Sequence, residues 1–344
     1  MNSDFERIFS ELCCLNGGSG AEDEIRNYII GKISGSCKSI KVNKAGCIIA
    51  KKKGRKKAES RCMISAHMDE VSLVVTYIND DGTMQFDTAG GVSPDVCAGR
   101  RISVNGRNGV IGTTAVHHLS ADDLKKPVGL GALHIDIGTN SREETEKYVS
   151  PGDYVYFAAD YRTDNGYVTS KAIDDRAGCA IMIDMICSSL LEYDAVYAFV
   201  TREEIGLRGA GTAAYDIDPD FAIVLEATTA ADIPIAHGDK KCCFLGRGAV
   251  VSYMDRSTVY DRELYNTANR LAKENNIPVQ TKLVVAGGND SGVIHITRGG
   301  IRTAAISVPC RYLHSPSCKA MTADIESCEQ IAVLLADHCS AVKK

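Results

Sequence analysis

Several strand-length apolar stretches in this chain end in a histidine or a carboxylate, and no other feature of the sequence constrains the fold as strongly. The predicted strand 61–66 leads directly into His67, and Asp69 follows two residues later. In open α/β sheets, ligands bind beyond the carboxyl ends of the strands. A histidine in that place, with a carboxylate able to orient its imidazole, predicts a metal site at the edge of a sheet.

Three later strand-like runs follow the same pattern. Their carboxyl ends lead to four further side chains that can bind a metal: Glu203, Glu204, Glu226 and His314. A fifth position, Asp174, stands near the start of the apolar helix predicted for residues 171–190. Acidic residues are ordinary at a helix start, because the helix dipole favours them there. The combination of positions, rather than any single one, indicates a common site.

Two histidines and three carboxylates at one sheet edge suit a dinuclear site for zinc or a similar divalent metal. Imidazole suits zinc and its neighbours, and carboxylates also accept cobalt and manganese. Two cations about 3.5–4 Å apart need a bridging carboxylate and a bridging water. The adjacent Glu203 and Glu204 would then divide their roles, because one binds metal and the other stays free as a general base.

Other copies of these motifs lack a preceding apolar strand. The triplets 134–136 and 237–239 also have a histidine two residues before an aspartate, and residues 143–144 repeat the paired glutamates. Each of these is more often structural than ligating when it stands alone. The glycine-rich stretch 17–20 lacks the Lys-Ser/Thr pair of a phosphate-binding loop, so it predicts a turn at a helix entry.

Length and local pattern predict an α/β protein with a smaller inserted unit. The chain has 344 residues, which allows one large domain and a second, smaller one. After about residue 71, the alternation of predicted helices and strands gives way to short strands with alternating apolar and polar residues, separated by Gly-, Asn- and Asp-rich turns. We expect a discontinuous catalytic domain of residues 1–70 and 165–344, and an inserted β-rich domain of residues 71–164.

Composition disfavours several other classes of protein. The formal net charge is −5, and the lysines at 51–53 and 56–57 lack basic surroundings, so we expect a solvated hairpin and no nucleic-acid surface. No apolar run approaches the length of a membrane span, and we expect no secretory signal and no membrane partner. The 14 cysteines show no C-x-x-C spacing, which favours free thiols in a reducing cytoplasm.

Four segments of the site carry a family resemblance: residues 67–71, 171–178, 203–210 and 311–316. At these residues the chain resembles the glutamyl-aminopeptidase and tetrahedral-aminopeptidase family of cytoplasmic dinuclear metallopeptidases, whose relatives include some labelled endoglucanase. The resemblance spans nearly the whole chain, with segments 135–138 and 141–144 similar to the family's inserted domain. It implies a mixed-sheet α/β/α metallopeptidase domain, phosphorylase/hydrolase-like, with a small inserted PDZ-like domain for dimerisation.

The resemblance also implies a role for each residue of the site. Two divalent metal ions, zinc before cobalt or manganese, would share five ligands: His67 and Glu226 on one ion, Glu204 and His314 on the other, and Asp174 between them. Glu203 would be the general base that takes a proton from the bridging water and hands it to the leaving amine. Asp69 would hold the His67 imidazole. Family members assemble into large homo-oligomers, often dodecamers.

The expected function is a metal-dependent aminopeptidase that acts on short peptides through attack of a metal-bridging hydroxide. A near alternative is another amidohydrolase on the same scaffold, such as a deacylase of N-acyl amino acids. A non-catalytic, metal-stabilised scaffold is the alternative from another class, and the free carboxylate of Glu203 argues against it. Glycoside hydrolysis normally uses two carboxylates and no catalytic metal, which argues against the endoglucanase label.

Three positions depart from the family's pattern. Ser72 stands where a glycine is expected, and Glu226 stands where many members have aspartate. Glutamate adds one methylene and still ligates, so Glu226 stays in the predicted ligand set. Asn289 replaces an expected threonine in a Gly-Gly-x-Asp turn, which points to an effect on substrate selectivity.

Overall fold

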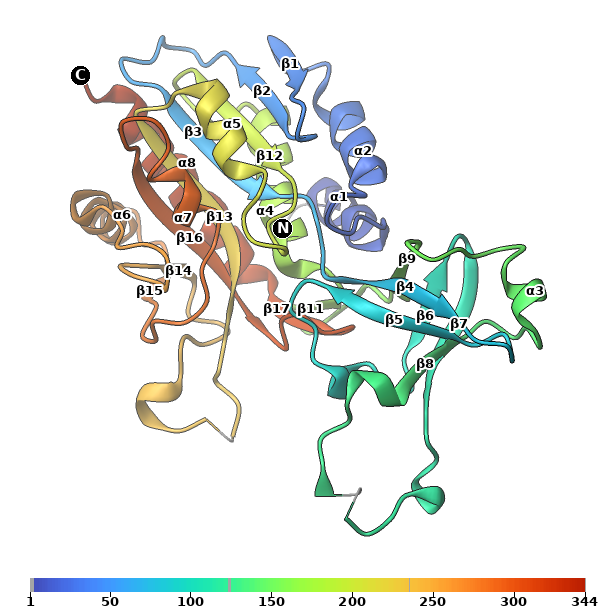
Figure 1. Ribbon diagram of the computed structural model, residues 1–344. Helices are drawn as coiled ribbons and strands as arrows, with labels where there is room; N and C mark the ends of the chain where they lie inside the picture. The colour runs from blue at the N-terminus through green and yellow to red at the C-terminus, as the bar shows by residue number, and fades with distance from the viewer. Residues whose placement is uncertain (1–2, 123–124, 235, 344) are drawn as a thin grey trace.

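The computed structural model describes residues 3–122, 125–234 and 236–343 as a mixed α/β structure with a smaller barrel beside it (Figure 1). Within these residues the large sheet runs in the order β1-β2-β12-β3-β13-β16-β17-β11-β10, and β14 and β15 branch from β16. Its strands are β1 (Ser39–Val42), β2 (Ile48–Lys52), β3 (Cys62–His67), β10 (Arg162–Asp164), β11 (Tyr167–Ser170), β12 (Ala195–Val200), β13 (Phe221–Thr229), β14 (Ala249–Val251), β15 (Val279–Thr281), β16 (Arg302–Arg311) and β17 (Cys318–Met321).

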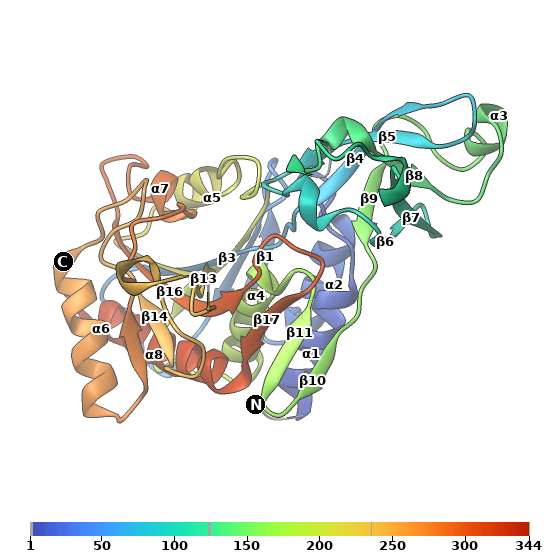
Figure 2. The ribbon, with the colours of Figure 1, turned by 90° about the horizontal axis from the view of Figure 1, so that it is seen from below.

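Helices cover both faces of this sheet (Figure 2). One face packs against α1 (Ser3–Cys14), α2 (Asp23–Ile33), α4 (Ile173–Cys187), α6 (Arg262–Glu274) and α8 (Thr322–Ala341). The other face packs against α5 (Ala210–Ile217) and α7 (Ser291–Ile294). None of the helices in the described ranges is both long and apolar enough to cross a membrane.

The strand pattern explains this three-layer arrangement. Successive side chains of a strand point to opposite faces of its sheet. In β3, Ile64 packs with the core around α4, whereas Met63 packs with the core around α5. In β13, Ile223 and Val224 divide in the same way. A strand buried on both faces reads as a continuous apolar run, which is why these strands could be predicted from the sequence.

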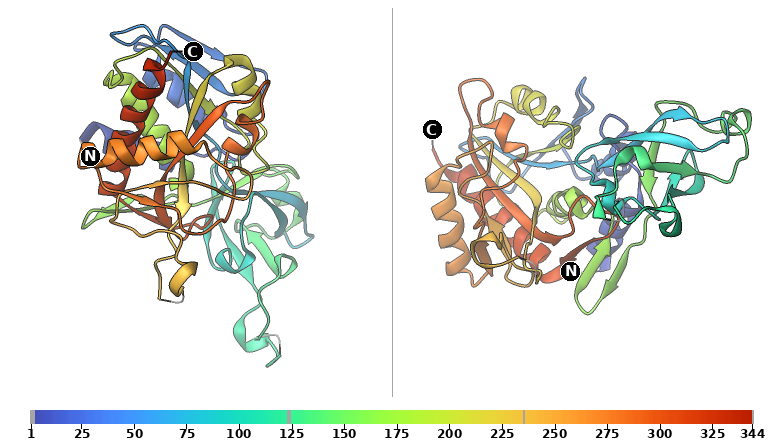
Figure 3. Two further views of the ribbon diagram at one scale, coloured as in Figure 1. Left: turned by 90° about the vertical axis from the view of Figure 1, so that its left-hand side faces the viewer. Right: turned by 60° about the horizontal axis from the view of Figure 1, so that its bottom comes forward.

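The barrel interrupts the large sheet between β3 and β10. Its strands close in the order β4-β5-β8-β7-β6-β9, around a core of their own. Two views show it to one side of the layered sheet (Figure 3). Its strands and single helix are β4 (Ser72–Ile78), β5 (Met84–Ala89), β6 (Arg101–Val104), β7 (Arg107–Thr113), β8 (Leu133–Asp136), β9 (Tyr154–Phe157) and α3 (Arg142–Thr145).

The barrel's last strand ends earlier than the predicted inserted unit. We expected that unit to extend to residue 164, but β10 (Arg162–Asp164) already pairs with β11 of the large sheet. The short strands β14 and β17 were not predicted, because three or four residues are too few to show a period. The strand β15 ends at Thr281, and Lys282 and Val284, which follow it, line the cleft described below.

Candidate metal centre

Parallel pairing brings the predicted site residues to one edge of the sheet. Strands β12, β3, β13 and β16 are neighbours, and each adjacent pair is parallel. His67 is the last residue of β3 and pairs in register with Val200, the last residue of β12. Glu226 lies in β13 opposite Ser307 of β16. The carboxyl ends of these strands therefore meet at one edge, as the sequence predicts.

Asp174 lies between the two histidines. The Nε2 atom of His67 is 3.3 Å from Asp174 Oδ1 and 3.2 Å from Glu226 Oε1. The Nε2 atom of His314 is 3.5 Å from Asp174 Oδ2 and 3.4 Å from Glu204 Oε2. The two oxygens of a single carboxylate thus face two separate sets of nitrogen and oxygen donors.

The backbone at Asp174 is not helical, although it lies within the bounds of α4. Asp174 has φ −80° and ψ 112°, and Asp175 has φ −115° and ψ 43°; a cis peptide bond joins them. Asp175 accepts hydrogen bonds from the backbone N–H groups of His67, at 3.3 Å, and Gly178, at 2.9 Å. Asp175 therefore caps the regular part of α4 and joins it to β3, whereas Asp174 faces the cluster.

These donors form three overlapping groups among the described residues that suit metal ions. His67, Asp174 and Glu226 each offer a ligand atom within 4.8 Å of the others, and so do Asp174, Glu204 and His314. The third group is His67, Glu203 and Glu204. Glu226 Oε2 is buried and has no hydrogen-bond partner among the described residues. Imidazole with carboxylate is a donor set that zinc, cobalt and manganese accept. The residues present therefore fit a pair of divalent cations.

The histidines of the cluster sit in a strongly negative environment. Burial opposes a charge on His67, but the negative charge of Glu226 and the hydrogen bonds with Asp174, Asp69 and Glu226 together outweigh it and hold the pKa of His67 well above its ordinary value. A hydrogen bond with Asp174 is the main cause that raises the pKa of His314 to about 10. Both shifts stabilise positive charge at the cluster.

The carboxylates show the same excess of negative charge. Burial raises the pKa of Glu204 to about 7 and holds the pKa values of Glu203 and Glu226 well above the ordinary range. Burial would also raise the pKa of Asp174, but hydrogen bonds with His314 and His67 outweigh it and lower that pKa. Without cations the cluster must bind protons to remain buried, and divalent metal ions supply the same compensation.

Asp69 connects the His67 strand to the glutamate pair. The Nδ1 atom of His67 is 3.0 Å from the backbone carbonyl oxygen of Asp69 and 3.5 Å from its carboxylate. That carboxylate accepts hydrogen bonds from the backbone N–H groups of Glu203 and Glu204, at 3.0 and 3.2 Å, and from Ser19 Oγ at 2.5 Å. Asp69 thus fixes the turn that carries both glutamates as well as lying beside His67.

The barrel contributes backbone to the site. His314 Nδ1 lies 3.0 Å from the carbonyl oxygen of Gly91, in the segment after β5. A Cβ atom at Gly90, which has φ +100°, would lie 3.2 Å from Glu204 Cβ. A cleft of about 490 Å³ opens between this segment and the large sheet. Its lining includes Asp174, Glu203, Glu226 and His314.

The structure adds residues that pattern alone did not reveal. Asp290 is buried, and neither of its carboxylate oxygens has a hydrogen-bond partner within the described part of the chain. Burial raises its pKa to about 7, and its charge contributes to the raised pKa of Glu203. Asn289 lines the cleft, and its side chain bonds Tyr260 Oη at 3.0 Å. The Gly-Gly-x-Asp turn was the only sequence signal for either residue.

The competing motifs lie elsewhere. His134 is in β8 of the barrel, residues 143–144 are in α3, and His237 precedes a short 3₁₀ turn; none of them belongs to the metal-binding groups found in the described ranges.

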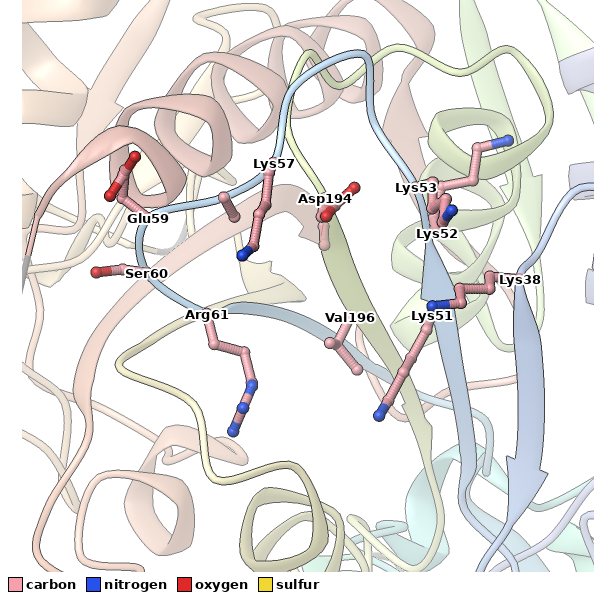
Figure 4. A pocket seen from close by; sticks show the side chains of 12 residues that line it. Lys38, Lys51, Lys52, Lys53, Lys57, Glu59, Ser60, Arg61, Asp194 and Val196 are labelled. Atoms are coloured by element: carbon pink, nitrogen blue, oxygen red, sulfur yellow. The ribbon is translucent and has the colours of Figure 1, made fainter.

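A basic pocket lies near the start of β3, away from the carboxyl ends of the strands. It measures about 360 Å³, and Lys51, Lys57 and Arg61 are among its lining side chains (Figure 4). No histidine is among the described residues that line it. Arg61 is held at 2.7 Å from the carbonyl oxygens of Ile217 and Asp218, while Lys51 and Lys57 are exposed. Glu59 and Asp194 also line this pocket, but neither belongs to a metal-binding group found among the described residues.

Comparison with known proteins gives consistent results for the whole chain. A family model described as M42 glutamyl aminopeptidase matches residues 46–331. A protein of Acetivibrio thermocellus, provisionally named an aminopeptidase, is 41% identical over 327 residues, which cover 95% of this chain and 96% of that protein. The lysyl aminopeptidase of Pyrococcus furiosus is 31% identical over 333 residues, covering 94% of each chain.

Solved structures agree with these sequence matches. The TET1 peptidase of Pyrococcus horikoshii superposes with a TM-score of 0.83 and 30% identity, covering 96% of this chain and 99% of that one. Its description states that it can assemble into a tetrahedron or a large octahedral shell.

Proposed function

The chain belongs to the M42 glutamyl aminopeptidase family and is a metal-dependent aminopeptidase, and from this premise we propose how its own residues perform the reaction. The observation that carries the proposal is the sharing of Asp174 between two groups of donor atoms. Glu203 is not in either group that contains Asp174, although it lies within 4.8 Å of His67 and Glu204, and we assign it to proton transfer.

Five side chains hold two divalent metal ions in this proposal. His67 and Glu226 would hold one ion, Glu204 and His314 would hold the other, and Asp174 would be shared between them. The distances of 3.2–3.5 Å between the histidine nitrogens and the carboxylate oxygens support this assignment. Zinc suits the mixture of imidazole and carboxylate, and cobalt and manganese are the alternatives.

Cations held by these residues would polarise the scissile carbonyl and lower the pKa of a bound water molecule. Glu203 accepts a proton from that water as it attacks, and then passes the proton to the leaving amine. In the metal-free chain, burial holds the pKa of Glu203 well above its ordinary range. Asp69 keeps Glu203 in place through the backbone hydrogen bond at 3.0 Å.

The substrates of this proposal are short peptides with a free N-terminus. The barrel separates the cleft from solvent on one side, because the segment around Gly91 touches His314. We assign this barrel, within residues 71–164, to a PDZ-like domain that dimerises the chain, and the remaining residues to the catalytic domain. The assemblies described for the TET1 peptidase support a homo-oligomer, which we propose to be a dodecamer.

The cytoplasm is the compartment we propose for this enzyme. All 14 cysteines are free thiols, and most of them are buried. Disulfides form and persist in oxidising compartments and are rare in the cytosol.

Hydrolysis of aminoacyl chromogenic amides, with free and with N-acylated amines, tests the proposed activity. The enzyme is assayed as purified, after chelation, and after separate addition of zinc, cobalt and manganese. We expect cleavage of free-amine substrates only, lost on chelation and restored by metal. Cleavage of acylated substrates alone would instead identify a deacylase. If no substrate is hydrolysed with metal present, the result would support a non-catalytic scaffold.

A further inference from the structure

The basic pocket near the start of β3 has more positive charge than its own carboxylates neutralise. Six basic and two acidic side chains are among its described lining, a net formal charge of +4, whereas the whole chain has −5. The six basic residues are Lys38, Lys51, Lys52, Lys53, Lys57 and Arg61. A concave site with one sign of charge concentrates ligands of the opposite sign, so this pocket suits an anion.

The sheet register places two of these cations on either side of an apolar residue. Lys51 of β2 pairs with Val196 of β12, which pairs in turn with Met63 of β3, two residues after Arg61. Neighbouring strands are about 4.8 Å apart, so the backbones that carry Lys51 and Arg61 are separated by roughly 10 Å. Figure 4 shows Val196 between these two basic side chains. The spacing leaves room for a small ligand between them, above Val196.

The ammonium groups of Lys51 and Lys57 have no ion-pair or hydrogen-bond partner in the described ranges. Other lysines of the same segment are paired. Lys56 forms an ion pair with Glu192 at 2.8 Å, and Lys52 donates to the carbonyl oxygen of Ser36 at 2.9 Å. The charges of Lys51 and Lys57 are therefore left for a ligand.

The two acidic residues of the pocket do not neutralise these cations. Asp194 Oδ1 accepts a hydrogen bond from the backbone N–H group of Gly54 at 2.9 Å. Glu59 points away from Lys57 and Arg61 (Figure 4). No ion pair joins Glu59 or Asp194 to a basic residue within the described part of the chain. Arg61 is fixed by its two bonds of 2.7 Å to the carbonyl oxygens after α5, which hold its charge at the edge of the pocket.

The charge and the size of the pocket both favour a small phosphorylated anion. A phosphate group bears about −1.5 to −2 charges at pH 7, so two linked phosphates match a local charge of +4 better than one carboxylate does. Lysine and arginine are the side chains that bind phosphate in proteins. The volume of about 360 Å³ lies within the roughly 300–1,000 Å³ of small-molecule sites. A nucleic acid would instead need a basic stripe along the surface.

We propose that the basic pocket binds a diphosphate group through Lys51, Lys57 and Arg61. Inorganic diphosphate and nucleoside diphosphates present the same group, and the test below distinguishes them. The site is separate from the metal centre, because Arg61 precedes His67 by six residues along the direction of β3. At about 3.3 Å per residue, the two positions are roughly 20 Å apart. The inference therefore does not depend on the chemistry of the metal centre.

Calorimetric titration with inorganic diphosphate, ADP, phosphate and sulfate at one ionic strength tests the proposal. We expect one diphosphate per chain, bound about tenfold or more tightly than phosphate or sulfate, with an affinity that falls as salt is added. The affinity should be the same in zinc-loaded and in chelated protein, and elemental analysis after the titration checks that diphosphate has not removed the zinc. Binding of ADP as well would show that the site accepts nucleotides, and binding of diphosphate alone would identify the inorganic ion as the ligand.

Matched variants connect this binding to the pocket. The double variant Lys51→Met, Lys57→Met should lower the affinity for diphosphate about tenfold or more. Lys273→Met removes an exposed lysine of α6, outside the pocket, and should leave the affinity unchanged. Circular dichroism of each variant without ligand confirms that it is folded.

Three results would overturn the inference. The first is no binding of diphosphate or ADP by the wild type at millimolar concentration. The second is equal affinity for sulfate, phosphate and diphosphate, or an unchanged affinity in the folded double variant, because either would mean adventitious binding of anions or binding elsewhere. The third is a single-stranded oligonucleotide that binds more tightly than diphosphate and loses its affinity in the double variant, which would assign the pocket to nucleic acid.

Discussion

Glu203 and Glu204 are adjacent in the chain, but the structure gives them different surroundings. Glu204 lies 3.4 Å from His314, whereas Glu203 has no ion-pair partner among the described residues. Asp69 accepts hydrogen bonds from the backbone N–H groups of both glutamates.

Among the residues of the site, the sequence predicted which side chains meet, because a strand end is visible as the end of an apolar run. It did not reveal that Asp69 supports the glutamate turn, since that contact joins segments 134 residues apart.

The variant Glu203→Gln tests the assignment of the general base. Glutamine keeps the shape of the side chain but cannot accept the proton, so we expect kcat to fall by roughly 10²- to 10⁴-fold. Metal content, measured by elemental analysis, should remain that of the wild type, because Glu203 is not a proposed ligand. Glu143→Gln, in the glutamate pair of α3, serves as the control and should change neither quantity. Normal turnover in Glu203→Gln would refute the assignment.

At the scale of elements, a buried ion network joins β3 to the start of α4. Lys171 Nζ lies 2.7 Å from Glu70, and Arg176 lies 3.2 Å from the same carboxylate. All three side chains are at most 4% exposed. Since Asp174 lies between Lys171 and Arg176 in the sequence, this network holds the segment that carries the proposed bridging carboxylate.

Removing Glu70, the centre of this network, should destabilise the folded chain strongly. Glu70→Ala leaves two buried cations without their partner, and we expect a loss of about 3–5 kcal/mol in the free energy of unfolding. Glu274→Ala, which breaks an exposed pair with Arg270, is the control and should cost only about 0.3–0.5 kcal/mol. Chemical denaturation measures both values. Equal, small effects would mean that the network does not hold the two elements together.

The contact between α4 and α8 predicts a pH dependence of stability. Burial is the main cause that raises the pKa of Glu329 to about 8, and its hydrogen bond with Asp184 adds to the rise. The folded chain therefore keeps a proton that the unfolded chain releases near its ordinary pKa of 4.5. The resulting stabilisation is complete below that value and is lost as the pH rises through about 8.

The variant Glu329→Gln should remove this dependence. Glutamine stays neutral at every pH, so the melting temperature should fall less between pH 5 and pH 8 than in the wild type. Glu59→Gln, an exposed position, should retain the wild-type slope. Melting curves of the three proteins at both pH values give the comparison, and parallel slopes for wild type and Glu329→Gln would exclude Glu329 as the cause.

Strands buried on both faces were the most predictable elements. β12 is buried along its whole length, and its continuous apolar run ends at Val200 before polar residues, so its end is visible in the sequence. β14 was missed, yet it inserts between β16 and β15 and thereby places Lys282 at the cleft. A segment of three residues carries no periodic signal, so the position of Lys282 could be learned only from the sheet order.

At the scale of the whole molecule, the cleft lies where the barrel meets the layered α/β structure. The barrel's own core and the three-layer core are separate, and the contact of Gly91 with His314 connects barrel and metal centre. The sequence predicted an insertion, because short alternating strands replace the α/β rhythm after β3. It did not predict a closed barrel, since closure depends on pairing between strands that are distant in the chain.

Metal binding by the chelated protein is the direct test of whether the chain holds two ions that share Asp174. Zinc is titrated into the metal-free chain by calorimetry, with elemental analysis of the product, and hydrolysis of a free-amine substrate is followed in parallel. We predict two zinc ions per chain in the wild type, activity that appears as they bind, and a loss of both in Asp174→Asn. Full activity in the metal-free chain, or unchanged zinc binding by Asp174→Asn, would contradict the account.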